Sequence, residues 1–397
     1  MDNTSQKEFK MIIAGGKTGG HLFPAIAIAQ AVLRLRSDAK ILFVGTGEQF
    51  ETQTLSRYGF SHEKISSTGI KGKGIIDKVK AVFQIPISII QALFIIIRFK
   101  PDIVIGVGGF SSGPVVLAAK LWGVRTAIQE QNSIAGITNR IVENFADVIF
   151  TSFKETKRLK QTQKIIYTGN PIRRGLANSL SRLNSKNGSE NSSENGHKLE
   201  NQNGLKKFTI LVTGGSQGAR SINSAFVEAL KLIDEKRELE KYSIIHQTGA
   251  TDEERVLEEY KKLPSYKNFV ASDNSPFVVQ PFFNDLPDIQ ASADLIICRA
   301  GAGTISEIAA IGKVALFVPY PYAADDHQTY NAKELADNGA AWIVLDSELS
   351  GELLKDRIEF AYSHPEELLK MAQRSKEFGN PLADEMIASI CLKMVNS

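Results

Sequence analysis

Short apolar runs rich in β-branched and aromatic residues alternate along this chain with segments of helix length, in two separate series. The first series comprises residues 10–14, 40–45, 102–107, 126–130, 147–152 and 165–168. The second comprises residues 208–213, 242–247, 277–281, 295–298, 314–319 and 341–345. Strands that alternate with helices pair in parallel through right-handed crossovers, so the pattern predicts two doubly wound α/β domains. Ligands bind such domains at the carboxyl ends of the strands.

Length and turn signals agree with two domains. The chain has 397 residues, which suits two domains of ordinary size. A turn sequence, Gly169-Asn170-Pro171, follows the first series, and we place the boundary there, between domains at 1–172 and 173–364. In residues 178–204, Asn, Ser and Gly make up 16 of 27 positions. Such a segment cannot bury a core, so we interpret it as a disordered insertion in the second domain.

Composition excludes several classes of protein. Apolar residues make up 43% and charged residues 23% of the chain, both ordinary for a globular protein. The net charge of +3 alone implies no nucleic-acid partner, and we expect none. The only cysteines, Cys298 and Cys391, cannot build a disulfide framework or a zinc cluster, which favours a reducing compartment. The polar start MDNTSQKEFK predicts no secretory signal.

Charge is unevenly distributed between the two halves. Residues 1–172 hold 22 Lys and Arg against 12 Asp and Glu, a net +10, and the remainder holds 25 against 32, a net −7. This asymmetry indicates an anionic partner or surface for the N-terminal half, with drift in surface composition as the alternative.

An apolar stretch lies in the same half. Residues 81–97 contain 13 apolar residues of 17, fewer than the about 20 that a membrane-spanning helix needs. On a helix, Gln84, Ser88 and Gln91 form one narrow polar stripe. Two interpretations stay open: a core helix packed on a sheet, or a helix whose outer surface touches lipid. The preceding GIKGKGIIDKVK mixes Ile and Val with Lys, which is typical of a membrane-surface patch.

Three glycine-rich turns follow strands: GGKTGGH at 15–21, GVGGFSSG at 106–113 and GGSQG at 214–218. Glycine lets the backbone approach a phosphate, and the N–H groups that open the next helix favour negative charge. One such turn could serve only strand-to-helix packing, but three at matching points indicate phosphate binding. The motif of nucleoside-triphosphate-binding loops does not match, because Met11 stands where that motif needs Gly. The dinucleotide fingerprint G-x-G-x-x-G does not match either, because Lys17 and Ser111 stand at two of its Gly positions.

Six motifs in order carry a resemblance to a known family: GGKTGGHLFPAIAIA, GVGGFSSGP, QEQNSIAGITNR, TGNPIRR, VTGGSQGARSIN and CRAGAGTISEIAAIGKVALFVPYP. The chain resembles the bacterial MurG family, the undecaprenyldiphospho-muramoylpentapeptide β-N-acetylglucosaminyltransferases. The resemblance implies a GT-B fold, with two Rossmann-like domains facing a central cleft and a last helix, within about 365–397, that packs back on the first domain. It also implies inverting transfer of N-acetylglucosamine from UDP-N-acetylglucosamine to the 4-hydroxyl of the muramoyl sugar of lipid I, forming lipid II.

The family pattern implies a donor site in the second domain. Its residues are Arg173, Ser216, Phe283, Gln328 and the run Ala302, Gly303, Thr304, Ile305, Ser306 and Glu307. Arg173 and Ser216 would bind the diphosphate, since a guanidinium donates in a fork to phosphate oxygens. Glu307 would accept from the ribose hydroxyls, whereas spacing alone makes Thr304-x-x-Glu307 a helix capping box. The backbone of Phe283 would meet uracil, and Gln328 the transferred sugar.

The acceptor site would lie in the first domain. Thr18, Gly19 and Gly20 would border the cleft, and Asn132 would lie near the transferred sugar. The residues expected at the lipid diphosphate are Gly108, Gly109, Ser111 and Ser112.

The reaction needs a base and a means of stabilising the leaving UDP. His21 is the candidate base, because imidazole titrates near the operating pH; its alternative role is to bind substrate only. We group Glu307 and Gln328 with it as catalytic candidates. Loop dipoles and Arg173 suffice for UDP, so we expect neither a metal nor a cofactor beyond the donor. Asp325 and Asp326 are adjacent and do not form a spaced Asp-x-Asp metal motif.

The resemblance also implies partners and a location. We expect lipid I, the anionic inner leaflet and other proteins of cell-wall synthesis as partners, at the cytoplasmic face of the bacterial inner membrane. Two departures stand out: Lys17 lengthens the usual GGTGGH loop, and Phe110 stands where some members carry Tyr. The alternatives are another GT-B transferase or a UDP-sugar epimerase with a soluble acceptor, and a membrane-bound nucleotide-sugar sensor.

Overall fold

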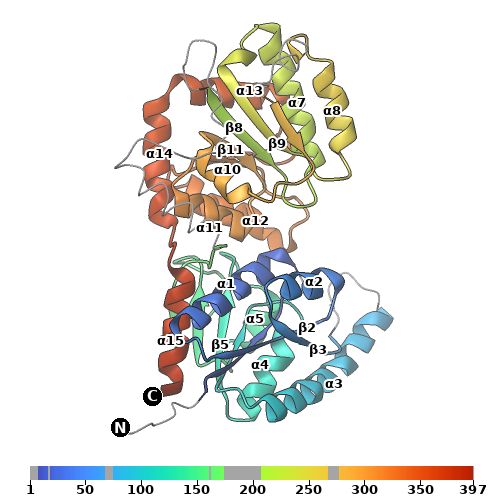
Figure 1. Cartoon of the computed structure of the whole chain (residues 1–397), viewed down its shortest axis with the longest axis vertical. Coiled ribbons are helices and arrows are strands. Elements are labelled where there is room, and N and C mark those ends of the chain that lie inside the picture. The colour runs from blue at the N-terminus through green and yellow to red at the C-terminus, as the bar shows by residue number, and fades with distance from the viewer. Residues whose placement is uncertain are drawn as a thin grey trace. The chain divides into compact units, whose positions relative to one another are not determined.

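The computed structural model describes residues 8–16, 18–67, 75–160, 162–173, 207–266 and 277–396, with the side chains of 75–83 and 396 left out. The chain divides into unit 1, Met1–Arg173 with Asn380–Ser397, and unit 2, Arg174–Gly379 (Figure 1). Lys17 and the Asn/Ser/Gly-rich stretch 178–204 lie outside the described residues, and so do Ile70, Lys71 and Lys73.

Unit 1 contains a parallel sheet in the order β3-β2-β1-β4-β5-β6-β7. Its strands are β1 (Lys10–Ala14), β2 (Lys40–Gly45), β3 (Ser61–Lys64), β4 (Ile103–Gly106), β5 (Arg125–Glu130), β6 (Val148–Thr151) and β7 (Ile165–Tyr167). The sequence predicted every strand except β3, whose residues Ser-His-Glu-Lys carry no apolar pattern because it is an exposed edge strand. The doubly wound topology is thus confirmed in this unit, with the order reversing between β1 and β4.

Two helical layers cover this sheet. The helices are α1 (Gly19–Leu35), α2 (Gln49–Arg57), α3 (Ile75–Phe99), α4 (Ser112–Leu121), α5 (Ile137–Val142) and α15 (Ala383–Asn396). Alternate residues of β1 face opposite ways, as a strand requires. Met11 and Ile13 pack with α1 and α15, whereas Ile12 and Ala14 pack with α3 and α4.

The C-terminal segment forms two helices where the resemblance implied one within 365–397. The first, α14 (Pro365–Phe378), packs on α11 (Ala302–Ile311) in unit 2. The second, α15, packs on α1, where Arg34 donates to Asp384 at 2.7 Å and pairs with Glu385 at 3.1 Å. The side-chain amide of Asn380, shortly before α15, donates to the carbonyl of Thr168 at 2.7 Å. This bond ties the start of α15 to the Gly169-Asn170-Pro171 turn.

Unit 2 contains a second parallel sheet, in the order β10-β9-β8-β11-β12-β13. Its strands are β8 (Phe208–Thr213), β9 (Tyr242–Gln247), β10 (Phe277–Gln280), β11 (Leu295–Cys298), β12 (Ala315–Phe317) and β13 (Trp342–Ile343). Its remaining helical elements are α7 (Arg220–Glu235), η1 (Leu239–Lys241), α8 (Glu253–Lys261), α10 (Leu286–Ser292), η2 (Ala324–Asp326), α12 (His327–Ala336) and α13 (Gly351–Ser363). Each of these strands matches a run predicted from the sequence.

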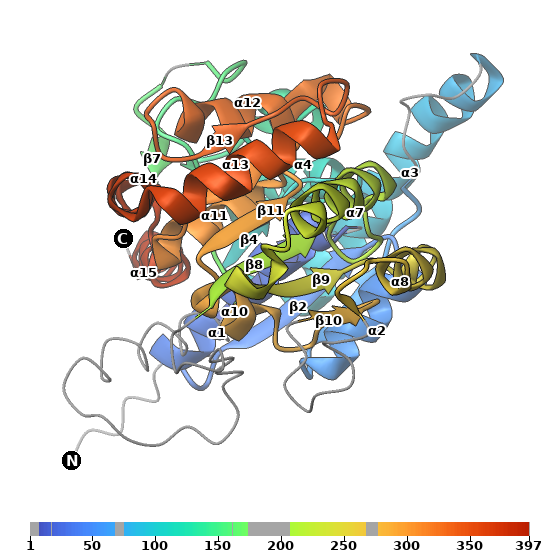
Figure 2. The same cartoon turned by 90° about the horizontal axis from the view of Figure 1, so that it is seen from above.

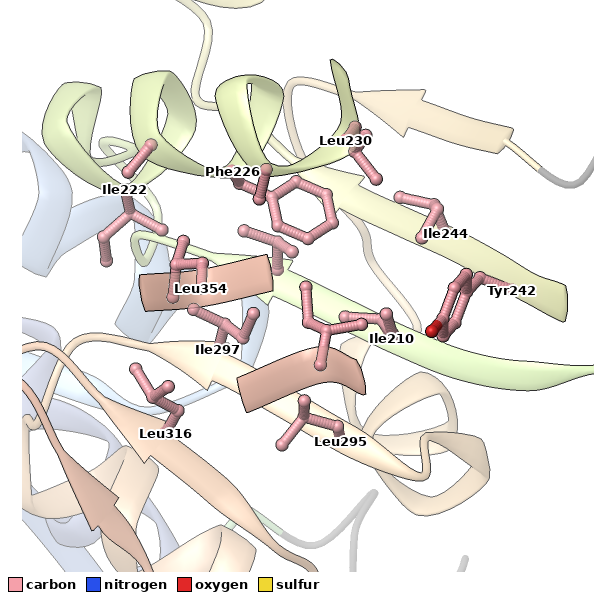
Figure 3. Close-up of a cluster of buried hydrophobic side chains, with 14 of the residues drawn as sticks. Ile210, Ile222, Phe226, Leu230, Tyr242, Ile244, Leu295, Ile297, Leu316 and Leu354 are labelled. Atoms are coloured by element: carbon pink, nitrogen blue, oxygen red, sulfur yellow. The ribbon is translucent and has the colours of Figure 1, made fainter. Parts of the chain in front are cut away.

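The core of unit 2 lies on both faces of its sheet. On one face, α7 and α13 lie side by side over the strands, and Phe226 and Leu354 meet Ile210 and Ile297 there (Figures 2 and 3). On the other face, α10, α11 and α12 cover a cluster built around Leu211 and its neighbours. Sheets buried on both faces explain why the strands read as continuous apolar runs.

Helix α3 turns its polar stripe toward the protein. The hydroxyl of Ser88 is buried and bonds the carbonyl of Ser66, and Gln91 Oε1 accepts from the N–H of Ser66 at 2.7 Å. Ala92 and Ile96 pack on the sheet, while Ile90 and Phe94 are 54% and 69% exposed. One face of this helix is therefore core, as the first interpretation predicts. A second apolar face is exposed, and its contact with lipid stays a prediction.

Within the described residues, no helix is long and apolar enough to cross a membrane.

Candidate active-site loops

The first glycine loop leads from β1 into α1. Gly15 and Gly16 have φ values of +118° and +117°, which L side chains rarely adopt. A Cβ at Gly15 would lie 2.1 Å from the carbonyl oxygen of Gly108, so this glycine lets the first and second loops touch. Thr18 is the N-cap of α1 and is exposed with Gly20, and Gly19 is the first helical residue. The N–H groups that open α1 can therefore face a ligand.

The second loop leads from β4 into α4. Gly108 and Gly109 have φ values of +91° and +81°. The side chains of Ser111 and Ser112 are 2% and 0% exposed, and Ser112 Oγ has no hydrogen-bond partner among the described residues. What this loop can offer an anion is therefore its backbone N–H groups and the N-terminus of α4, not two hydroxyls.

His21 lies in the first turn of α1 with its ring against the second loop. A Cβ on Gly108 would be 2.9 Å from Cε1 and 3.0 Å from Nδ1 of the imidazole, so the ring occupies the space that a side chain would need. Its Nδ1 lies 3.0 Å from Oε1 of Gln131, which follows β5. The candidate base and the second glycine loop are thus adjacent within unit 1.

Asn132 is held by a buried carboxylate. Glu130 is 1% exposed and accepts from the N–H of Asn132 at 2.9 Å and from its side-chain amide at 3.2 Å. The same carboxylate accepts from the N–H of Gly136 at 2.9 Å and from Nδ2 of Asn139 at 2.8 Å. Four N–H donors satisfy this buried charge and fix the loop that presents Asn132. Glu130 belongs to the QEQNSIAGITNR motif, but the sequence predicted no role for it.

Arg173 is the last residue of the first stretch of unit 1, Met1–Arg173. Its guanidinium carbon lies 5.7 Å from the ring centroid of Phe23, a cation–π distance. Its role toward the donor diphosphate stays a prediction.

In unit 2, the third glycine loop is braced by Gln247 at the end of β9. Gln247 Nε2 donates to Thr213 Oγ1 and to the carbonyl of Gly215, each at 3.0 Å. Its Oε1 accepts from the N–H of Phe283 at 3.0 Å. One side chain thus joins the exposed loop around Ser216 to the backbone N–H of Phe283.

A buried polar cluster supports the same loop. His246 Nδ1 lies 3.0 Å from the Tyr260 hydroxyl, and its Nε2 lies 3.1 Å from Asn223 Oδ1. Asn223 Nδ2 donates to the carbonyl of Thr248 at 3.0 Å, and a Cβ on Gly218 would lie 2.0 Å from that carbonyl. Complete burial lowers the pKa of His246 to about 3, so the imidazole is neutral.

The run 302–307 opens helix α11. Gly301 is the N-cap, so Thr304 lies inside the first turn and the capping-box interpretation of Thr304-x-x-Glu307 is wrong. Ala302, Gly303 and Thr304 supply the N–H groups at the positive end of the helix dipole, and Ile305 is buried in the core. Glu307 is 6% exposed. Its predicted bonds to ribose hydroxyls, and the role of Ser306, stay predictions.

Gln328 and Arg299 organise the carboxyl ends of β11 and β12. Gln328 Oε1 accepts from the N–H of Ala300 at 3.2 Å and of Tyr320 at 2.9 Å, which makes its NH2 group the donor end. Arg299 pairs with Asp346 at 2.6 Å. It also donates to the carbonyls of Val318 and Pro319, each at 3.2 Å, and to the Ser221 hydroxyl at 2.9 Å. We missed Arg299, although its place directly after a strand in CRAGAG was a signal.

Neither the acidic nor the thiol side chains build a metal centre in the described part of the chain, where no group of three His, Cys, Asp or Glu side chains could hold an ion. Both cysteines are buried, and burial raises the pKa of the Cys391 thiol to about 12 and that of Cys298 further. Cys298 is fully buried within the core of unit 2.

Comparisons with known proteins agree along the chain. Residues 11–151 match the glycosyltransferase family 28 N-terminal domain, and residues 209–387 match the family 28 C-terminal domain. A relative from Syntrophus aciditrophicus, named UDP-N-acetylglucosamine--N-acetylmuramyl-(pentapeptide) pyrophosphoryl-undecaprenol N-acetylglucosamine transferase, is 42% identical over 97% of this chain and 99% of its own. A relative of the same name from Myxococcus xanthus is 38% identical over 97% and 93%. The crystal structure of Acinetobacter baumannii MurG is similar with a TM-score of 0.74 and 30% identity, covering 97% of this chain and all of that one.

Proposed function

The chain belongs to the MurG branch of glycosyltransferase family 28, and we propose that it is the transferase that forms lipid II in peptidoglycan synthesis. It transfers N-acetylglucosamine from UDP-N-acetylglucosamine to the 4-hydroxyl of the muramoyl sugar of lipid I, with inversion. The observation that carries this conclusion is the relationship over nearly the full length of both chains, which includes both units and not one shared domain. The GT-B fold and its parallel sheets agree with it.

The reaction forms one bond and breaks another. The acceptor oxygen bonds the anomeric carbon of N-acetylglucosamine while the bond from that carbon to the diphosphate breaks, and UDP leaves with the electron pair. The proton of the acceptor hydroxyl goes to His21, which we propose as the general base. Support comes from the position of its ring, which lies against Gly108 of the loop proposed for the acceptor diphosphate.

Unit 2 would bind the donor. We propose that Ser216 and the N-terminus of α11, at Ala302, Gly303 and Thr304, bind the diphosphate together with Arg173. The exposed position of Ser216 and the helix dipole of α11 support this. The carbonyl of Phe283 would accept from uracil, Glu307 from the ribose, and the oriented NH2 group of Gln328 would donate to the transferred sugar.

Unit 1 would bind the acceptor. We propose that the backbone N–H groups of Gly108 and Gly109, with those that open α4 at Ser111 and Ser112, bind the lipid diphosphate. Thr18, Gly19 and Gly20 would contact the acceptor at the start of α1, and Asn132 would contact the sugar at its fixed loop.

We propose that unit 1 also binds the anionic inner leaflet, at an apolar face formed by α3, α4 and α5. The exposed residues of this face are Ile85, Ile87, Ile90, Phe94, Ile97, Leu121, Trp122, Ile137, Ile141 and Phe145. Their helices cover the same side of the sheet, since α3 packs on α4 and α4 on α5. An apolar face of this size on a half of net charge +10 fits a lipid surface that carries a polyprenyl diphosphate.

The test of the reaction is transfer of labelled N-acetylglucosamine from its UDP donor to a short-chain lipid I analogue. A soluble muramoyl peptide without the lipid diphosphate serves as the control acceptor, and each reaction runs with and without a chelator. We expect product only with the lipid diphosphate, and the same rate with chelator. Isomerised UDP-sugar from donor alone would instead support an epimerase, and donor binding without product would support a sensor.

The base assignment has its own test. His21→Ala should lower turnover at least about a hundredfold, the usual scale of general-base catalysis, with donor affinity unchanged. His62→Ala, on the edge strand β3, is the matched control and should retain activity. Near-normal turnover of His21→Ala would reject this role.

Membrane binding can be separated from catalysis. Phe94→Gln with Leu121→Gln should weaken cosedimentation with anionic vesicles by roughly several hundredfold, since burying each of the two side chains is worth about 2 kcal/mol. Leu369→Gln, on the exposed side of α14 in unit 2, is the matched control. Turnover of a soluble short-chain lipid I should stay unchanged in both, and equal vesicle binding by both would reject the proposed face.

A further inference from the structure

Two glutamine side chains form a buried amide chain behind His21. Gln129 lies in β5 and Gln131 directly after it, and they are 0% and 1% exposed. Gln131 Nε2 donates to the carbonyl of Val107 at 2.7 Å and also to Gln129 Oε1. Gln129 Nε2 in turn donates to Asn170 Oδ1 at 3.1 Å and to Ser152 Oγ at 3.2 Å.

The carbonyl of Val107 decides which way the amide of Gln131 points. A backbone carbonyl only accepts, so the Gln131 NH2 group must face it, and the two hydrogens of that group go to Val107 and Gln129. The opposite orientation would set Oε1 of Gln131 against two acceptor oxygens. The oxygen of Gln131 therefore faces His21.

An acceptor oxygen at 3.0 Å from Nδ1 requires that Nδ1 carry the hydrogen. A neutral imidazole holds one N–H, so its lone pair for a proton is then on Nε2. Gly108 holds the ring in this plane, because only a residue without Cβ fits beside Cε1 and Nδ1.

We propose that Gln131 is a positioning residue that fixes the neutral ring of His21 as the Nδ1–H tautomer and so directs Nε2 to the acceptor hydroxyl. The proposal deepens the proposed function and rests on His21 as its base. The acceptor proton moves to Nε2, the ring becomes an imidazolium, and Gln131 Oε1 continues to accept from Nδ1–H. The amide chain through Gln129 to Asn170 ties this orientation to the turn that precedes Arg173.

The direct test is a nitrogen NMR spectrum of the full-length protein, isotope-labelled at its histidine ring nitrogens, at a pH where the imidazoles are neutral. His21→Gln identifies the His21 signals by their loss. In the wild type we expect Nδ1 to have the shift of a protonated ring nitrogen and Nε2 that of an unprotonated one. In Gln131→Met, which keeps the length but removes the acceptor, we expect the two shifts to average or exchange. A wild-type ring protonated at Nε2, or an unchanged signature in Gln131→Met, overturns the proposal.

Gln129→Met is the matched control. It removes an equally buried amide two residues earlier in the chain but leaves the Val107 carbonyl to orient Gln131, so the His21 signature should persist. If Gln131→Met does not fold, the wild-type spectrum still tests the tautomer on its own. If Gln129→Met changes the signature as much as Gln131→Met, general loosening of the site explains the effect and the proposal fails.

Turnover gives the second readout. A base held in the wrong tautomer loses activity steeply, so Gln131→Met should lower kcat by at least about tenfold, with donor affinity unchanged. The spectrum is taken without substrate, so its result on the tautomer is valid even if the proposed reaction is wrong. Conversely, the transfer assay on the wild type tests the reaction even if the tautomer is wrong. If the His21 signature is lost in Gln131→Met as predicted but kcat is unaltered, the catalytic part of the proposal is overturned.

Discussion

The imidazole of His246 lies fully buried between β9, α7 and α8, in the cluster that supports the third glycine loop. Burial lowers its pKa from 6.5 to about 3, and the nearby Asp252 opposes that shift only in part. We predict that unit 2 loses stability on mild acidification because of this one side chain. The perturbation is a change from pH 7 to pH 5, with His246→Gln as the comparison.

The sign follows from proton binding. The unfolded chain takes up a proton at His246 as pH falls below 6.5, whereas the folded unit does not until pH approaches 3, so stability falls between these values. The slope for one group is about 1.4 kcal/mol per pH unit, which makes the loss about 2 kcal/mol between pH 7 and pH 5. This magnitude needs only a folded pKa well below 5. Carboxylates with lowered pKa, such as Glu259 at about 2, lose their contribution below the ordinary value of 4.5 and so leave this window clear.

The assay is urea unfolding followed by tryptophan fluorescence. The chain has two tryptophans, Trp122 in unit 1 and Trp342 in unit 2, so Trp122→Phe leaves a signal from unit 2 alone. The free energy of unfolding of that protein should fall by about 2 kcal/mol from pH 7 to pH 5. In the His246→Gln background the stability is lower at both values but should change little between them.

Two results would refute the reasoning. A free energy that is level between pH 7 and pH 5 in the His246 protein would mean that the folded imidazole accepts a proton, with Asp252 outweighing burial. An equal fall with and without His246 would assign the effect to other groups. Donor binding measured over the same range links the cluster to the loop, because Asn223 and Thr248 connect His246 to Gly218.

Three further changes test the loops. Gly108→Ala should lower turnover at least about tenfold, since its Cβ would lie 2.9 Å from Cε1 of His21; Gly123→Ala, at a similar φ of +80° with open space, is the control, and equal activity of the two would contradict us. Glu130→Gln should lower the free energy of unfolding by about 2 kcal/mol or more in a urea titration, because an amide NH2 group replaces an acceptor of buried N–H groups; no change would mean that the carboxylate is dispensable. Arg299→Lys should raise the donor KM several-fold in the transfer assay because Lys lacks the guanidinium fork that bonds both Asp346 and the Ser221 hydroxyl. An unaltered KM would exclude a role of Arg299 in positioning the donor site.

The strands were predictable because a parallel sheet covered by helices on both faces needs continuous apolar runs. Strands β1, β2, β8, β9 and β11 begin and end where the sequence placed them. The edge strand β3 was not predicted because its backbone pairs with β2 but none of its side chains is buried. Periodicity senses burial, so a polar edge strand gives it no signal.

The candidate site was predictable to the level of loops. Glycines with positive φ, at Gly15, Gly108 and Gly215, are visible in sequence as glycine clusters after strands. The capping-box interpretation of Thr304 failed because the spacing S/T-x-x-E does not reveal where a helix begins, and α11 begins two residues before Thr304. Only the position of Gly301 after β11 decides that start.

Sequence patterns could not identify the residues that act on other residues. Gln131, Glu130 and Gln247 are ordinary polar residues at strand ends, and their importance arises from hydrogen-bond partners on other elements. Gln131 donates to the Val107 carbonyl, Glu130 accepts from the side-chain amide of Asn139, and Gln247 accepts from the N–H of Phe283. Each is buried with its hydrogen-bonding groups satisfied, which costs stability unless the geometry is fixed. Gln131 and Gln247 bond the second and third glycine loops, and Glu130 bonds the loop of Asn132, so each holds a loop of the candidate site in one orientation. We therefore expect substitutions at these three positions to alter turnover or substrate affinity by more than their effect on folding, and that comparison distinguishes positioning from packing.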